Sequence, residues 1–422
     1  MKQILILFII LFNTLLLQAA YILIPMDQSQ KDHLKAYGLA YWVLKQDVEV
    51  NWLLNYRGGS FMIKDAKIIE GECKIRGVTF ELIADAQSTA ILNEISNPEI
   101  NMENVKLEKA PKVAVYSPKT KQPWDDAVTL VLKYAEISYD VIYDEEILKE
   151  KLPLYDWLHL HHEDFTGQYG RFWAMYRNAA WYQEQERVLE ASAKSMGFQK
   201  VSQMKLAVAK KIRDFTSGGG FLFAMCSAPD SYDIALAADE VDICENMFDG
   251  DGTTANYNSK LDFSKTFAFT NFVLNTNPNE YAKSNIDTYG TRKEKHGVKR
   301  ENDLFTLFEF SAKWDVVPTM LCQNHEQIIK GFWGQTAGFD KSFVKPNVLI
   351  LGENKAANEA RYIHGSYGKG TFTFYSGHDP EDYEHRVEDP PTDLSLHPNS
   401  PGYRLILNNI LFPAAKKKKQ KT

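Results

Sequence analysis

The stretch GGGFLFAMCSAPDSY, residues 218–232, constrains the fold of this chain more than any other segment. Its glycines end a polar, helix-forming segment, and FLFAM has the length and apolar character of a buried strand. Cys226 follows this strand directly, and helix-forming residues begin again at Ser231. Alternation of buried strands and helices is typical of α/β proteins with a parallel sheet. The sequence therefore predicts an α/β fold in which Cys226 occupies the turn between a strand and a helix.

Apolar strands and amphipathic helices alternate in two further places. Strand–helix–strand units are expected at 21–56 and at 112–147, and each such βαβ unit favours a parallel sheet. Residues 73–85 have strand character, whereas the polar stretch 94–109 resembles a linker. The predicted organisation is a signal peptide at 1–20, an N-terminal βαβ module at 21–110, an α/β domain at 111–415 with an insertion at about 245–345, and a basic tail at 416–422.

The N-terminus has the features of a secretory signal peptide. Lys2 precedes an apolar run, 4–12, and Gln18-Ala19-Ala20 offers small residues, the two alanines, for cleavage. The run is shorter than the roughly 20 residues of a membrane-spanning helix. The sequence therefore predicts an exported protein of the periplasm or cell envelope, with no stable membrane anchor after cleavage of the signal.

Charge and cysteine content exclude some classes of partner and of architecture. The chain has 48 Lys and Arg against 55 Asp and Glu, a formal net charge of −7, which does not favour binding of nucleic acid. The four cysteines are too few and too scattered for a disulfide framework, and no CxxC pair indicates a structural zinc site. We expect a small-molecule or glycan ligand and assign no metal or cofactor from the sequence.

Cys226 and His378 are the candidate catalytic residues. A thiol on a turn that enters a helix lies near backbone N–H groups, which favour a thiolate and stabilise an oxyanion. His378, in the motif SGHDPED, ends a later strand and has the residue type of a general base, oriented by Glu381 or Asp379. The alternatives are that Cys226 is a small buried residue at a strand end and that His378 closes a turn.

The motif HLHHED, residues 159–164, is a second candidate centre. Alternation along a strand places His159 and His161 on one face and His162 on the other. Three histidines with two carboxylates at a strand end are possible zinc ligands, together with His378 or Asp379. The alternative is that they pack in the sheet and hydrogen-bond the loop. We expect His161, His162 and the next loop to contact a ligand at this edge, through Glu163, Asp164, Gly167, Gln168 and Gly170.

Residues 112–413 resemble the class I glutamine amidotransferase-like fold, including its trehalose-utilisation-type members. The resemblance rests on the opening βαβ unit, on GGGFLFAMCSA and on a late strand that ends in GHDPE. It implies a three-layer, flavodoxin-like, mostly parallel sheet. It also implies that Cys226 is the nucleophile, His378 its base and the Ser227 backbone N–H an oxyanion donor.

The chain as a whole also resembles an exported bacterial family commonly labelled asparagine synthetase B, on segments such as WLLNYRGGSFM and HLHHEDFTGQYGRF. The motifs do not support that label. True members need an N-terminal cysteine and an ATP-binding loop, whereas here Lys2 follows the first methionine and Ser217-Gly218-Gly219 continues into Gly220.

Three functions therefore remain open from the sequence. The first is a cysteine-dependent hydrolase or amidase that acts on an envelope-derived small molecule or glycan. The second is a non-catalytic ligand- or glycan-binding module on the same fold, with His161, His162 and Glu163 as polar contacts. The third is a metal-assisted hydrolase centred on the histidines.

Overall fold

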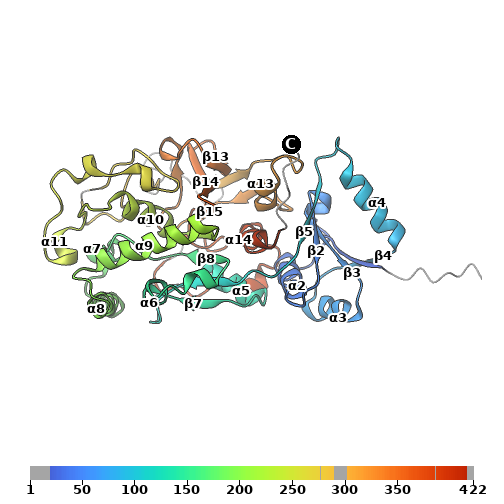
Figure 1. Ribbon diagram of the computed structural model, residues 1–422, viewed down its shortest axis with the longest axis horizontal. Helices are drawn as coiled ribbons and strands as arrows, with labels where there is room; N and C mark the ends of the chain where they lie inside the picture. The colour runs from blue at the N-terminus through green and yellow to red at the C-terminus, as the bar shows by residue number, and fades with distance from the viewer. Residues whose placement is uncertain (1–19, 276, 289–301, 385, 416–422) are drawn as a thin grey trace, which may run out of the picture.

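The computed structural model describes residues 20–275, 277–288, 302–384 and 386–415. The predicted signal peptide, except Ala20, and the predicted basic tail lie outside these ranges. The described chain forms a smaller N-terminal unit and a larger second unit, each with its own sheet (Figure 1).

The N-terminal unit is a five-stranded sheet with the strand order β4-β1-β3-β2-β5. Its elements are β1 (Tyr21–Ile24), α2 (His33–Lys45), β2 (Val50–Leu54), β3 (Ser60–Lys64), α3 (Lys67–Arg76), β4 (Glu81–Ile83), α4 (Asp85–Ser96) and β5 (Glu103–Leu107). The six elements from β1 to β4 form a βαββαβ unit, the split βαβ arrangement of ferredoxin-like folds.

The strand–helix–strand order expected at 21–56 is present as β1-α2-β2, but the parallel sheet that it favours is wrong. Strand β3 lies between β1 and β2 and is antiparallel to both. The connection 55–59 is too short for a crossover, so β3 must fold back on β2 as a hairpin. The predicted linker at 94–109 is also wrong, because β5 pairs with β2 along the edge of this sheet. Most of the strand expected at 73–85 is helix α3 and a turn, with only β4 extended.

The second unit is built on a ten-stranded sheet with the order β11-β10-β13-β14-β15-β9-β8-β6-β7, and β12 pairs with β14. Its strands are β6 (Val113–Tyr116), β7 (Asp140–Ile142), β8 (Trp157–Leu160), β9 (Phe221–Met225), β10 (Leu304–Leu307), β11 (Ile328–Lys330), β12 (Phe339–Asp340), β13 (Leu349–Asn354), β14 (Glu359–Tyr367) and β15 (Gly370–Tyr375). The five strands β7-β6-β8-β9-β15 are parallel, and the others are antiparallel. The expected α/β fold is therefore present, with a mixed sheet.

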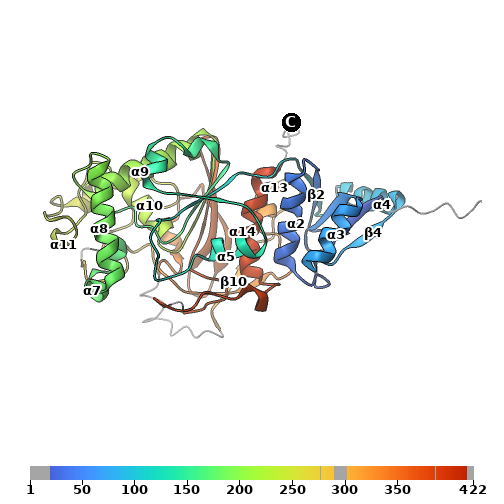
Figure 2. The same ribbon diagram turned by 90° about the horizontal axis from the view of Figure 1, so that it is seen from below.

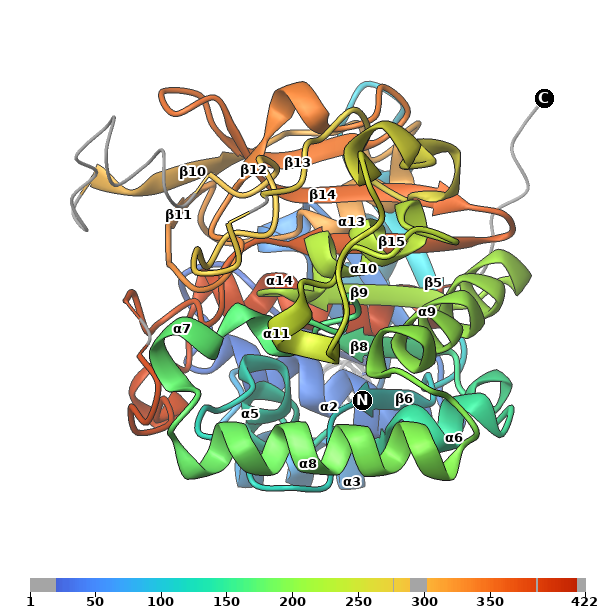
Figure 3. The same cartoon turned by 90° about the vertical axis from the view of Figure 1, so that its left-hand side faces the viewer.

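Helices cover both faces of this sheet. They are α5 (Ala127–Tyr134), α6 (Asp144–Leu148), α7 (Trp173–Tyr176), α8 (Ala180–Ser195), α9 (Val201–Gly218), α10 (Ala228–Ala237), α11 (Asn246–Asp249), α13 (Val316–Leu321) and α14 (Pro401–Leu411). Alternate residues of the central strands face opposite sides: Trp157 and Phe223 join the core with α5 and α14, while Leu158 and Leu222 join the core with α9 and α10. Figure 3 views the unit from the side of α8 and α9.

Helix α14 joins the two units. It packs against α5 of its own unit and against α2 of the N-terminal unit, and α2 and α14 lie side by side in Figure 2. Arg404 of α14 is fully buried and donates a hydrogen bond to the backbone carbonyl of Met26, 2.9 Å away. One apolar core consequently runs from the small sheet through α2, α5 and α14 to the large sheet.

The parallel strands also bring the candidate site residues together. Strands β6, β8, β9 and β15 are parallel and neighbouring, so the loops that follow them meet at one edge of the sheet. The four loops begin after Tyr116, Leu160, Met225 and Tyr375. None of the helices in the described ranges is long and apolar enough to cross a membrane.

Candidate functional site

Cys226 occupies a strained turn between β9 and α10. Its backbone φ is +54°, in the left-handed region that L-residues other than glycine rarely adopt. The Cys226 backbone N–H donates to the carbonyl of Gly377, 3.0 Å away, in the loop after β15. The turn is therefore fastened to the segment that carries His378.

The first turn of α10 is fastened to the loop after β8 in the same way. The Ala228 N–H donates to the His161 carbonyl over 3.0 Å, and the Ser227 hydroxyl donates to the His162 carbonyl over 2.7 Å. Three loops from different strands are thus tied to one another through backbone groups. This fixes the backbone of the two histidines relative to the Cys226 turn.

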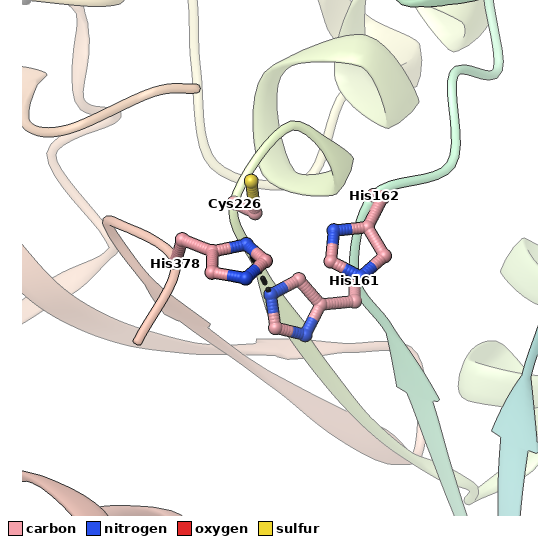
Figure 4. A group of neighbouring side chains, drawn as sticks. All are labelled: His161, His162, Cys226 and His378. Atoms are coloured by element: carbon pink, nitrogen blue, oxygen red, sulfur yellow. Dashed lines mark hydrogen bonds between the residues drawn. The ribbon is translucent and has the colours of Figure 1, made fainter. Parts of the chain in front are cut away.

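Three imidazole rings gather beside the thiol, as Figure 4 shows. The rings of His161 and His162 stack with centroids 4.0 Å apart, and His161 Nε2 lies 3.2 Å from His378 Nδ1. One side-chain nitrogen or sulfur atom from each of His161, His162, Cys226 and His378 lies within 4.8 Å of the others. We call these four residues the imidazole–thiol cluster. The predicted opposite orientation of His161 and His162 is wrong, because β8 ends at Leu160 and strand alternation ends with it.

Two aspartates that the sequence analysis missed hold the far sides of these rings. His378 Nε2 lies 3.2 Å from Asp125 Oδ1, and His161 Nδ1 lies 3.3 Å from Asp126 Oδ1. Asp126 is also the N-cap of α5 and lies 3.3 Å from His159 Nε2. The available signal was two adjacent aspartates at the start of a helix after a strand, a pattern that N-capping alone explains.

Burial dominates the electrostatics of the cluster. It raises the pKa of the Cys226 thiol to about 12, although the nearby backbone N–H groups of Gln335 and Ser227 and the charge of Lys283 act in the other direction. Burial also lowers the pKa of His161 to about 4 despite the adjacent Asp126. At neutral pH the thiol is protonated and the His161 ring is uncharged.

The predicted orienting acid is not where the sequence placed it. Glu381 Oε2 lies 3.2 Å from His397 Nδ1, and the carboxylate beside His378 is that of Asp125. Asp379 is fully buried, and its Oδ1 accepts a hydrogen bond of 2.8 Å from the Glu381 N–H. Asp379 therefore closes the turn after β15.

The predicted ligand-binding residues after His162 make other contacts. Glu163 accepts a hydrogen bond of 2.8 Å from Tyr143, lies 3.8 Å from Lys205 of α9, and has its pKa raised to about 7 by burial. Asp164 accepts backbone N–H groups from its own loop, at Thr166, Gln168 and Gly170. Gly167, at φ +81°, lies so close to Ser202 of α9 that a Cβ would be 2.6 Å from the Ser202 Cα. These residues shape the loop and do not belong to the imidazole–thiol cluster.

Aromatic side chains border the cluster. The ring of Trp124, next to the two aspartates, lies 5.5 Å from that of His162 and 5.2 Å from those of Phe172 and Trp181. Trp124 and Trp181 are partly exposed. The chemistry present at this edge is thus a buried thiol, three imidazoles, two carboxylates and a partly exposed aromatic wall.

Comparisons with known proteins do not assign a family. No family model matches this chain, and no curated protein matches it. Two solved structures, described as cytoplasmic proteins from Salmonella typhimurium and from its strain LT2, are similar at 11% identity with TM-scores of 0.35 and 0.36. Each match covers 72% of this chain and 100% of the other chain. A likeness of this degree assigns neither a family nor a function.

Proposed function

We propose that this protein is a cysteine-dependent hydrolase that cleaves a carboxamide or ester, with Cys226 as nucleophile, His378 as general base and Asp125 as the acid that orients His378. The observation that carries the proposal is the left-handed Cys226 turn, held against the loop of His378 by the bond from the Cys226 N–H to Gly377. Nucleophile elbows of α/β hydrolases use such a strained strand-to-helix turn.

The order of the parallel strands supports an amidotransferase-like placement. Numbered by their position in the chain, strands β7-β6-β8-β9-β15 run 2-1-3-4-5, the order of flavodoxin-like sheets. In such sheets ligands bind at the carboxyl ends of the strands, where Cys226 and His378 both lie. The predicted export would place the substrate, an envelope-derived small molecule or glycan, in the periplasm or cell envelope.

The residues at the cluster suffice for acyl transfer. With the Nε2 proton of His378 donated to Asp125, Nδ1 keeps its lone pair and takes the thiol proton as sulfur attacks the carbonyl carbon. The backbone N–H groups of Ser227 and Gln335 lie beside the sulfur and are the available oxyanion donors. His378 returns the proton to the leaving amine or alcohol, and water then hydrolyses the thioester with His378 again as base.

Trapping of the acyl-enzyme tests this assignment. Full-length protein freed of metal by chelation is mixed with a panel of activated esters and amides, quenched in acid and digested for mass spectrometry. We expect an acyl adduct on the peptide that contains Cys226. His378→Gln and Asp125→Asn should form it more slowly, by roughly 10²- to 10⁴-fold for the base.

Cys244→Ser is the matched control, because Cys244 is also a buried, free cysteine of the second unit. It should acylate at the wild-type rate, whereas Cys226→Ala should give no adduct. Turnover that persists in Cys226→Ala, or an adduct on another cysteine, would contradict the proposal.

A further inference from the structure

His161 and His378 each direct one ring nitrogen at the other, and a shared proton or a shared metal ion can lie between the two. His161 Nδ1 lies 3.3 Å from Asp126 Oδ1 and 3.3 Å from His159 Nε2, and His378 Nε2 lies 3.2 Å from Asp125 Oδ1. A metal ion between the rings requires the tautomers in which each carboxylate accepts the N–H of the ring beside it. The nitrogens that remain, His161 Nε2 and His378 Nδ1, then both carry lone pairs. They are 3.2 Å apart, and two lone pairs at that distance repel unless a proton or a metal ion lies between them.

The separation is that of two ligands on one tetrahedral metal ion. With Zn–N bonds of about 2.0–2.1 Å and tetrahedral angles, neighbouring ligand nitrogens lie about 3.3 Å apart, and a nitrogen and a thiolate sulfur about 3.6 Å. His162 and Cys226 each place a donor atom within 4.8 Å of this pair, so binding draws them inward by roughly 1 Å. Three imidazoles and one thiolate suit zinc in particular.

The aspartates are the support that metal-binding histidines ordinarily have. A ligating imidazole donates its other ring N–H to a carboxylate or carbonyl, which fixes its tautomer and its orientation. Both His161 and His378 have such a carboxylate, Asp126 and Asp125, from the same loop before α5. Asp126 is itself fixed, because it accepts the Thr129 N–H as the N-cap of that helix.

We infer that His161, His162, His378 and Cys226 bind one divalent transition-metal ion of the zinc type, which masks the Cys226 thiol. On binding, the S–H bond breaks, the sulfur bonds to the metal and the proton leaves to solvent, with no change of oxidation state. Four protein ligands close the coordination sphere, as in structural rather than catalytic zinc sites. This inference deepens the proposed function, because the metal-bound form withholds both the nucleophile and its base.

A different group in the described residues, Asp242, Cys244 and Asp249, also has metal-ligand geometry. The side chain of Lys200 already supplies a positive charge to this group, since its Nζ lies 2.7 Å from Asp242 and 3.0 Å from Asp249. Metal is therefore not expected there. Cys244 is therefore a control, because its thiol also lies among possible metal ligands but is not expected to bind metal.

Cobalt(II) and zinc(II) are the probes. Full-length protein freed of metal should bind one equivalent of Co²⁺ and develop the near-ultraviolet absorption of a thiolate–cobalt bond, which Zn²⁺ then abolishes by displacement. Zn²⁺ should also protect Cys226 from alkylation by iodoacetamide, read by peptide mass spectrometry. Cys226→Ser should lose the thiolate band, and Cys244→Ser should keep it.

The positioning aspartates give a graded test. Asp126→Asn should weaken Co²⁺ binding by roughly 10- to 100-fold while the thiolate band at saturation remains. A merely structural role for Asp126 would instead lower thermal stability and leave the affinity of the folded protein unchanged. Circular dichroism of each variant shows whether it is folded.

Three results would overturn the inference: no stoichiometric metal binding, a thiolate band that Cys244→Ser removes, or metal binding that leaves Cys226 open to alkylation. None of these measurements uses a substrate. Metal binding without acyl-enzyme formation would therefore refute the proposed function alone, and acyl-enzyme formation without metal binding would refute this inference alone.

Discussion

Cys226 is in a backbone conformation that its side chain does not favour. A left-handed φ costs an L-residue roughly 1–2 kcal/mol, a cost that glycine does not incur. The hydrogen bonds of the Cys226, Ser227 and Ala228 segment to neighbouring loops hold this conformation. The strain is therefore a local property of the turn that a stability measurement can detect.

Glycine should be tolerated at this position better than alanine. Glycine inside regular structure usually lowers stability by roughly 0.5–1 kcal/mol relative to alanine. Because φ is +54° at residue 226, we expect Cys226→Gly to be at least as stable as Cys226→Ala in urea unfolding. Ala224→Gly in β9 is the control and should be less stable than wild type. A Cys226→Gly protein that is clearly less stable than Cys226→Ala would show that the turn is not strained.

Part of the site could be predicted from residue patterns and part could not. Cys226, His378 and His161 each end a recognisable strand, so the rule that ligands bind at the carboxyl edge of the sheet brings them together. The sequence around Asp125 and Asp126 does not distinguish an aspartate that pairs with a histidine from one that caps a helix. The acid at His378 comes from more than 250 residues earlier in the chain, a contact that local sequence does not encode.

Elements with apolar sequence were predictable, and elements at sheet edges were not. Strands β6, β8 and β9 lie inside predicted runs because both of their faces are buried. Strand β5 is polar on one side, so its amino-acid composition resembles that of a linker. The order of the small sheet depends on the short β2–β3 connection, whose hairpin forces β3 between β1 and β2.

The contact between α2 and the end of α5 depends on Gly38. A Cβ at this position would lie 1.8 Å from the backbone oxygen of Ala135. We expect Gly38→Ala to lower the free energy of unfolding by roughly 3 kcal/mol, at the upper end for overpacking, since a backbone atom cannot move aside. Urea unfolding measures this change.

Gly71→Ala in α3 is the matched control, because nothing lies within 4 Å of its Cβ position. This variant should gain roughly 0.5–1 kcal/mol from helix propensity. Equal effects of the two substitutions would contradict the packing of α2 against α5.

At the scale of the whole molecule, a stacked pair of histidines, His33 buried and His325 half-buried, joins the two units. His33 of α2 stacks on His325, with ring centroids 3.9 Å apart, and Arg404 of α14 lies 3.3 Å from the His325 ring. Burial and the charge of Arg404 lower the pKa of His33 to about 4. Burial, His33 and Arg404 lower the pKa of His325 to about 3.

Acid should therefore weaken the junction of the units. An unfolded histidine titrates near 6.5, so below that pH the unfolded chain binds more protons than the folded one and stability falls as pH falls toward 4. Buried acids act in the opposite direction, since burial raises the pKa of Asp233 to about 6. The test is therefore a comparison: urea unfolding of His325→Gln between pH 7 and pH 4 should decline less steeply than wild type. The same slope in both proteins would exclude this role.

The central claim is that the Cys226 thiol and the His378 imidazole act as one chemical unit. The most direct measurement is the rate at which iodoacetamide alkylates Cys226 at pH 7 in metal-free protein, followed by peptide mass spectrometry with Cys322 as the internal reference. A buried thiol with a pKa of about 12 is almost wholly protonated at that pH and needs a base to react. We predict that His378→Gln slows alkylation of Cys226 by roughly 10²-fold or more without changing Cys322. Equal rates in wild type and His378→Gln would contradict the account.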